Sequence, residues 1–129
     1  MFKDIDLNRI TALYKEGDDL WMGNGYGICK MDIPSRTFTN YYLRDKDNNL
    51  MTRSVVRNFF RDKENILWVS TQSGLVKFEG DTPILFQPDP EDSLSLPDMF
   101  IMDALEDKDQ NLWLATSGEG MCLVSWDDE

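Results

Sequence analysis

A repeat of about 45 residues is the feature of this sequence that most limits how the chain folds. Three segments share a Leu-Trp pair followed by an apolar, a small and a polar residue, and their tryptophans are Trp21, Trp68 and Trp113. These tryptophans are 47 and 45 residues apart. Because a fixed period of roughly 20–50 residues makes the repeat the folding unit, the 129 residues are predicted to form about three units.

Each unit has the pattern of short strands separated by turns. Apolar stretches that end in acidic, turn-prone clusters precede the tryptophans and cover 10–16, 56–62 and 101–107. A glycine and another apolar stretch follow each tryptophan, and two units add a further stretch, 37–42 and 83–87. The runs are short, rich in aromatic and β-branched residues, and bounded by turn formers. Four antiparallel strands per repeat is the blade of a β-propeller, so we predict an all-β propeller fragment of about three four-stranded blades.

The blade boundaries follow from the repeat, and residues 1–129 are treated as a single propeller segment. The blades are predicted at about 8–43, 54–88 and 99–126, and residues 1–5 could supply the outer strand of the last blade. A propeller ring closes with ~4–8 blades, so three blades leave two lateral faces uncovered, and exposed apolar faces promote association. We therefore expect a homo-oligomer, with a dimer that closes a six-bladed ring favoured. A nine-bladed trimer, a monomeric arc and a part of a longer chain are the alternatives.

The charge and composition exclude several classes of function. The chain has 13 basic and 24 acidic residues, a net charge of −11, and no histidine. An acidic surface repels nucleic acid backbones and anionic lipid headgroups, so neither nucleic acid nor direct membrane contact is expected. Without histidine the commonest general base and metal ligand are missing, and no Ser or Cys has a visible base partner. No run of ~18 apolar residues and no signal-peptide core occur in the sequence.

Two kinds of segment resemble ligand-binding loops but lack the residues that the chemistry needs. The segments 45–49 and 107–111 are rich in Asp, as calcium loops are. A calcium loop also needs a glycine in mid-loop and a bidentate glutamate at its twelfth position, where Val56 and Gly118 stand instead. The glycine-rich segment 23–27 has no following helix and no lysine in register to cradle a phosphate. We interpret all of them as turns and expect no metal, no cofactor and no catalytic residue.

The residues around the tryptophans carry a family resemblance. The segment 65–78, Asn-Ile-Leu-Trp-Val-Ser-Thr-Gln-Ser-Gly-Leu-Val-Lys-Phe, and the loop 89–98, Asp-Pro-Glu-Asp-Ser-Leu-Ser-Leu-Pro-Asp, resemble the two-component regulator propeller repeat. The resemblance covers nearly the whole chain. It is best in the second unit and weakest in the first, where Asn24 stands at the threonine position.

The resemblance implies a periplasmic sensor region of hybrid two-component regulators of gut Bacteroidetes. In such proteins propellers precede a membrane span and a kinase, and they detect glycan fragments. The chain is therefore expected to be a non-catalytic, ligand-binding segment with an oligosaccharide as its ligand. A protein–protein interaction platform is the alternative, because a propeller fold does not determine function.

The candidate binding residues lie in the turns after the tryptophan strands, because propeller ligands sit at the faces of the ring. Their polar groups can hydrogen-bond sugar hydroxyls and need a complete ring to converge. The tryptophans themselves are interpreted as blade-core residues, since they recur at one position among apolar neighbours. The candidates are Asn24, Tyr26, Gln72, Ser73, Ser117 and Glu119.

Overall fold

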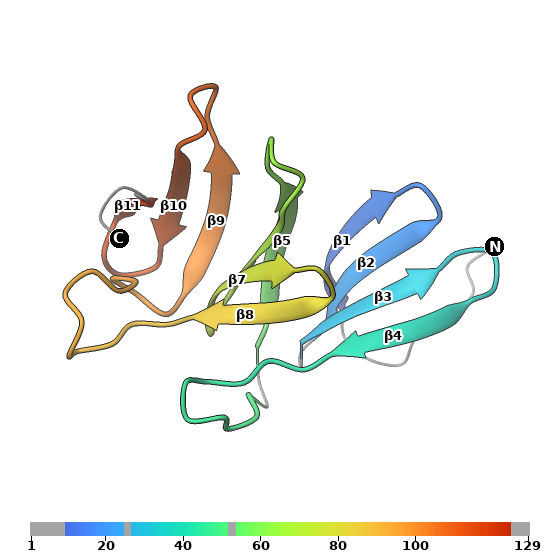
Figure 1. The fold of residues 1–129 in the computed structure, drawn as a ribbon, viewed down its shortest axis with the longest axis horizontal. Coiled ribbons are helices and arrows are strands. Elements are labelled where there is room, and N and C mark those ends of the chain that lie inside the picture. Colours follow the sequence, from blue (N-terminus) through green and yellow to red (C-terminus); the bar gives the residue numbers. More distant parts are fainter. Residues whose placement is uncertain (1–9, 25–26, 52–53, 125–129) are drawn as a thin grey trace.

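The computed structural model describes residues 10–24, 27–51 and 54–124. All regular elements in these ranges are β-strands, arranged in three antiparallel sheets that follow one another in chain order. Figure 1 shows the sheets side by side, the first in blue and cyan, the second in green and yellow, and the third in orange and red. The all-β architecture of three successive antiparallel blades is thus confirmed.

Each sheet corresponds to one repeat of the sequence. Blade 1 contains β1 (Ile10–Glu16), β2 (Asp19–Asn24), β3 (Ile28–Asp32) and β4 (Thr37–Tyr41). Blade 2 contains β5 (Val56–Arg61), β6 (Leu67–Thr71), β7 (Gly74–Glu79) and β8 (Thr82–Phe86). Blade 3 contains β9 (Ile101–Glu106), β10 (Leu112–Thr116) and β11 (Met121–Val124), with no fourth strand among the described residues. Residues 1–5, predicted to supply that strand, lie outside the described ranges.

Aspartates organise the acidic turns that precede the tryptophan strands. The Asp107 carboxylate accepts hydrogen bonds from the backbone N–H of Asp109 and Asn111, both at 2.9 Å, and from the Trp113 indole N–H at 2.8 Å. Asp62 does the same in blade 2, where the indole of Trp68 is 2.8 Å away. A carboxylate that accepts amide hydrogens from its own loop stabilises a turn. The interpretation of 107–111 as a turn is therefore confirmed.

The first core cluster lies between blade 1 and blade 2. Trp21 stacks on Tyr41 with ring centroids 5.4 Å apart, and Phe78 of blade 2 meets both rings edge-on at 5.2 and 5.1 Å. Stacked and edge-to-face pairs are the favourable geometries for aromatic rings. Removing these large side chains from water is the main force that holds the two blades together.

The second core cluster lies between blade 2 and blade 3. Trp68 and Leu75 of blade 2 are buried there with Ile101, Leu112 and Leu114 of blade 3. Trp21 and Trp68 thus occupy one position in the repeat and face the following blade.

The same face of blade 3 has no blade packed on it in the described part of the chain. Trp113 is only half-buried, and three large apolar neighbours are exposed, Leu105 by 55%, Met121 by 73% and Leu123 by 47%. Trp113 and these three residues are called the open face of blade 3.

Candidate functional site at the connection end of the blades

The loops that the sequence predicts to bind a ligand lie at one end of the blades. Because the strands alternate in direction, the second turn of each blade lies at the same end as the chain connections to the next blade. These connections are 42–55 and 87–100, and we call this end, at the lower edge of Figure 1, the connection end. Five of the six predicted binding residues, Asn24, Gln72, Ser73, Ser117 and Glu119, lie at turns of this end.

The first strands of the blades carry a β-bulge at this end. The first strands of neighbouring blades, β1 with β5 and β5 with β9, contact each other. In each of them the pairing register shifts at the second residue, which is Thr11, Arg57 or Met102. A bulge adds an unpaired residue and re-aims its side chain. Arg57 is exposed, and no hydrogen bond or ion pair joins its guanidinium to another described residue.

Two predicted binding residues lie beside these bulged strands. The backbone N–H of Gln72 donates to the carbonyl of Val55 at 2.9 Å, next to the start of β5. The backbone N–H of Ser117 donates to the carbonyl of Phe100 at 3.1 Å, next to the start of β9. The Ser117 side chain is exposed and that of Gln72 is half-buried. The structure thus brings Gln72 next to the strand that carries Arg57.

Ser73 and Asn24 make hydrogen bonds within the protein. Ser73 is 4% exposed, and its hydroxyl accepts a hydrogen bond from the Ser54 hydroxyl at 3.1 Å. Asn24 is half-buried, and its side-chain oxygen accepts the backbone N–H of Gly27 at 2.9 Å. Both side chains stabilise their turns, so the remaining exposed polar groups are better placed to reach a ligand.

Glu119 and Tyr26 complete the predicted set. Glu119 is exposed at the tip of the β10–β11 turn, where its backbone N–H donates to the Thr116 hydroxyl at 3.0 Å. Tyr26 lies outside the described residues, so its place between β2 and β3 of blade 1 as a binding residue stays a prediction.

Arg57 and Asp98 are residues of this end that the sequence did not single out. Asp98 accepts the backbone N–H of Gly118 at 2.7 Å and that of Phe100 at 3.3 Å, and the first of these bonds chiefly lowers its pKa. The carboxylate therefore ties the β10–β11 turn to the connection. The repeat spacing could have located the bulge, because Thr11, Arg57 and Met102 stand 10, 11 and 11 residues before their tryptophans. The residue types could not, because these three side chains share no chemistry.

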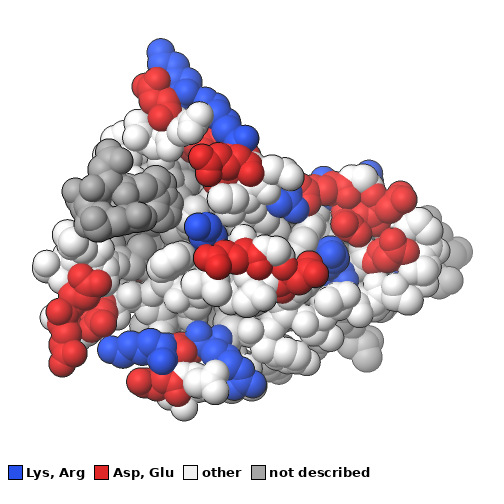
Figure 2. Space-filling model, in the orientation of Figure 1, with Lys and Arg blue, Asp and Glu red and all other residues white. Residues whose placement is uncertain are grey.

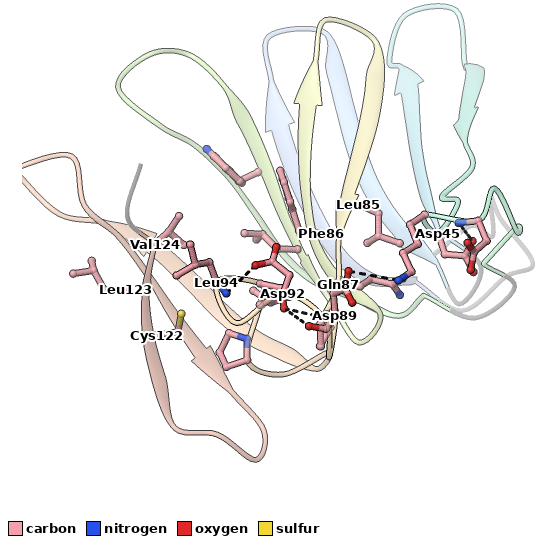
Figure 3. Close-up of a pocket in the computed structure, with 18 residues that line it drawn as sticks. Asp45, Leu85, Phe86, Gln87, Asp89, Asp92, Leu94, Cys122, Leu123 and Val124 are labelled. Atoms are coloured by element: carbon pink, nitrogen blue, oxygen red, sulfur yellow. Dashed lines mark hydrogen bonds and ion pairs between the residues drawn. The ribbon is translucent and has the colours of Figure 1, made fainter. Parts of the chain in front are cut away.

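A cavity of about 800 Å³ opens between blade 2 and blade 3. We call it the blade 2–3 groove. Its apolar side includes Phe86, which is 39% exposed, together with Leu94 and Val124 (Figure 3). Lys46 and Asp89, from different connections, lie 3.5 Å apart at its polar side. The carboxylates that line the groove belong to Asp45, Asp47, Asp89 and Asp92.

The groove has a physical origin in the repeat. Tyr41 and Phe86 each stand 15 residues before the first strand of the next blade, so they are equivalent. Phe78 and Val124 are equivalent as well, because each follows the residue paired with its blade's tryptophan. At the first interface the Phe78 ring packs on Tyr41 and Trp21. At the second interface a valine replaces that ring and leaves the space unfilled.

On the face drawn in Figure 2, acidic side chains lie over all three sheets with basic side chains between them, so the charges of this face are mixed. Within the described ranges, no group of three or more Cys, Asp or Glu side chains is arranged to hold a metal ion. The described residues also include no helix long and apolar enough to span a membrane.

The fold and the repeated connection end define the chain as a segment of a β-propeller. Residues 95–118 match the family described as the two component regulator propeller, which confirms the recognition of that repeat. The match lies in the third unit, whereas the sequence favoured the second. Comparison with curated protein sequences found no match.

Solved structures with the same fold come from larger proteins. The extracellular domain of BT3049 of B. thetaiotaomicron, assigned as a hybrid two-component system, is 20% identical with a TM-score of 0.71, and the match covers 90% of this chain and 14% of that one. PorZ, an essential surface component of the type-IX secretion system of Porphyromonas gingivalis, is 23% identical with a TM-score of 0.64, covering 89% and 17%. The extracellular domain of BT4673 of B. thetaiotaomicron, assigned as a one-component system, is 14% identical with a TM-score of 0.52, covering 96% and 28%.

These matches show the fold of the chain, and the matched proteins are much longer than the chain. The chain spans 14–28% of the length of the three similar structures. It is a propeller segment that resembles the extracellular domains of such two-component systems.

Proposed function

We propose that the chain is a non-catalytic, ligand-binding segment of a periplasmic sensor region and that its ligand is an oligosaccharide. The observation that supports this most strongly is the match of residues 95–118 to the two component regulator propeller together with the likeness to extracellular domains of two-component systems. The similar proteins are much longer, so the kinase and membrane span of a sensor would belong to a whole protein of that kind.

The connection end supplies groups that suit a sugar. The Arg57 guanidinium donates up to five hydrogen bonds, and the side chains of Gln72 and Ser117 both donate and accept them. Sugar hydroxyls need this mixture of donors and acceptors. The proposal assigns no cofactor and no reaction, because Arg57, Gln72 and Ser117 include no paired nucleophile and base.

The proposal is tested by titrating the chain with neutral and anionic oligosaccharides and measuring heat by calorimetry. Arg57→Ala and Ser117→Ala are expected to weaken binding by about tenfold each, the loss of roughly one hydrogen bond to a polar ligand. Lys15→Ala is the control, because Lys15 is also exposed but lies at the opposite end of its strand. Equal affinities in all variants, or no binding by the unmodified chain, would argue against a sugar site here.

Assembly is the second part of the proposal. We propose that the open face of blade 3 packs on blade 1 of a second copy, as Trp68 of blade 2 packs on blade 3. Leu13 of blade 1 stands at the same position in the repeat as Phe59 of blade 2, and the Phe59 ring contacts Trp21 of blade 1. Leu13 is 65% exposed. A dimer joined in this way has a six-bladed ring with a connection end on every blade. A protein partner on the same end would instead support the interaction-platform alternative.

A further inference from the structure

The blade 2–3 groove has the size and lining of a small-molecule site. Its volume is about 800 Å³, within the range of roughly 300–1,000 Å³ that is usual for ligand pockets. Trp68, Leu75 and Phe86 of blade 2 line it together with Val124 of blade 3 (Figure 3). Ligand pockets are mostly apolar, with a few polar groups that orient the ligand. The groove therefore offers room and apolar surface for a molecule with one aromatic ring and a short chain.

The first interface shows which chemical group suits the apolar side of the groove. There the Phe78 ring meets the Tyr41 ring edge-on, with centroids 5.1 Å apart. At the second interface Phe86 stands in the place of Tyr41, and Val124 stands in the place of Phe78. Tyr41 is only 9% exposed, whereas Phe86 is 39% exposed. An aromatic ring bound beside Val124 would therefore repeat the packing that Phe78 provides at the first interface.

The polar side of the groove is negatively charged. Its ionisable lining residues are one lysine and four aspartates, namely Lys46, Asp45, Asp47, Asp89 and Asp92. Lys46 and Asp89 lie 3.5 Å apart, so the one cation is already paired. A backbone hydrogen bond from its own turn chiefly lowers the pKa of Asp45 and likewise that of Asp89, so both are ionised at neutral pH. The surplus of carboxylates attracts a cation and repels an anion.

We propose that the blade 2–3 groove binds a small molecule that carries one aromatic ring and a protonated amine. The ring packs on Phe86 beside Val124, and the ammonium group donates hydrogen bonds to the aspartates of the groove, among them Asp92. Charge-assisted hydrogen bonds of this kind are the strong ones. Arg57 and Ser117 of the proposed sugar site do not line the groove, so the two proposals are tested separately.

Four small probes separate the contribution of the ring from that of the charge. Phenethylamine has both, phenethyl alcohol keeps the ring without charge, hydrocinnamate has the ring with a negative charge, and hexylamine has the charge without the ring. Amide NMR shifts of the isotope-labelled chain measure the dissociation constants. Phenethylamine should bind about tenfold more tightly than the alcohol and about fivefold more tightly than hexylamine, and hydrocinnamate should bind most weakly. The largest shifts are expected in residues 86–96 and 122–124.

A variant that fills the groove tests the place of the ring. Val124→Phe restores the side chain that Phe78 provides at the first interface, so it should weaken phenethylamine binding at least about tenfold, because its own ring takes the space. The same variant should raise the urea midpoint of unfolding, since it fills a cavity. Thr39→Phe, on the exposed strand β4 of blade 1, adds the same ring outside the groove and should change neither quantity.

A second pair of variants tests the charge and does not depend on how Val124→Phe folds. Asp47→Asn with Asp92→Asn, in the groove, should reduce the preference for phenethylamine over the alcohol. Asp18→Asn with Asp109→Asn changes the net charge equally on exposed turns of the opposite end and should leave the preference unchanged. The proposal is overturned if phenethylamine does not bind, if hydrocinnamate binds as tightly, or if both pairs behave alike. It is also overturned if binding is lost when light scattering shows a dimer, since a second copy would then occupy the groove.

Discussion

Gly23 of β2 lies directly against Val56 of the next blade. A Cβ atom built on Gly23 would lie 2.1 Å from the Cβ of Val56, far inside van der Waals contact. The equivalent residues in the other blades, Ser70 and Ala115, are also small. In blade 1 the small residue leaves room for Val56 at the start of the first strand of blade 2.

Gly23→Ala is expected to destabilise the chain by about 1–3 kcal/mol, since the added methyl group would force blade 2 away from blade 1. Urea unfolding followed by tryptophan fluorescence measures this. Gly118→Ala is the control, because a Cβ at Gly118 would meet its nearest atom at 3.4 Å, in ordinary contact. Equal midpoints for the two variants would contradict the close approach.

Substituting Trp68 and Trp113 in turn separates the contribution of packing from that of hydrogen bonding, because both make the same hydrogen bond but differ in burial. Trp68 and Trp113 each donate to a turn aspartate at 2.8 Å, but only Trp68 is buried between two blades. Trp68→Ala is expected to cost about 3–5 kcal/mol, because it leaves a cavity in the core. At a chain concentration where light scattering gives the monomer mass, Trp113→Ala should cost clearly less, because no described blade covers Trp113. A similar loss for both in thermal unfolding would mean that the turn, and not the interface, dominates.

The Asp107 turn predicts a specific pH dependence. The hydrogen bond from the Trp113 indole, followed by the backbone of Asn111, lowers the pKa of Asp107 from 3.8 to about 2. Because this pKa is lower in the folded chain, the ionised form stabilises the fold above pH 3.8, and that contribution is lost as the pH falls toward 2.

Asp107→Asn should therefore reduce the difference in unfolding midpoint between pH 6 and roughly pH 2.5. Asp109→Asn is the control, since its side chain accepts no hydrogen bond from another described residue. Denaturant unfolding at both pH values measures the effect. An unchanged pH dependence in Asp107→Asn would show that other carboxylates account for it.

An ion pair joins blades 1 and 2 across their interface. The Arg61 guanidinium contacts both carboxylate oxygens of Glu16, one of them at 2.9 Å, and this contact chiefly lowers the pKa of Glu16. Both side chains are partly exposed, so removing the pair should cost only about 1 kcal/mol. A double-mutant cycle of Glu16→Gln and Arg61→Met measures the coupling, which should shrink in high salt. Additive effects would mean that the contact contributes nothing to holding the blades together.

The open face of blade 3 makes a prediction about mass in solution. Light scattering over a range of concentrations should give a dimer for the unmodified chain and a monomer for Leu105→Glu with Leu123→Glu, because buried charge opposes an apolar interface. Leu94→Glu, on an exposed residue of the second connection, should leave the mass unchanged. Deleting residues 1–5 should weaken assembly if they supply the outer strand. A monomer at every concentration would reject the ring.

The sequence alone was enough to predict the strands and their order along the chain. Strand positions follow from local features, namely short apolar runs between Asp, Asn and Gly turns, and the tryptophan period reveals that the same unit recurs. The turn chemistry of Asp107 was equally predictable, because its partners lie within six residues of it.

The tertiary structure decided what lies between the blades. At the first interface Phe78 packs on Tyr41. At the equivalent place in the second interface the smaller Val124 stands opposite Phe86, and the difference in size leaves the blade 2–3 groove. Ser73, predicted to contact a ligand, has its hydroxyl next to Ser54 inside the protein. These contacts join residues from different strands and blades. Their outcome depends on the volume and direction of side chains that only the packed sheets bring together, which a single strand's pattern does not encode.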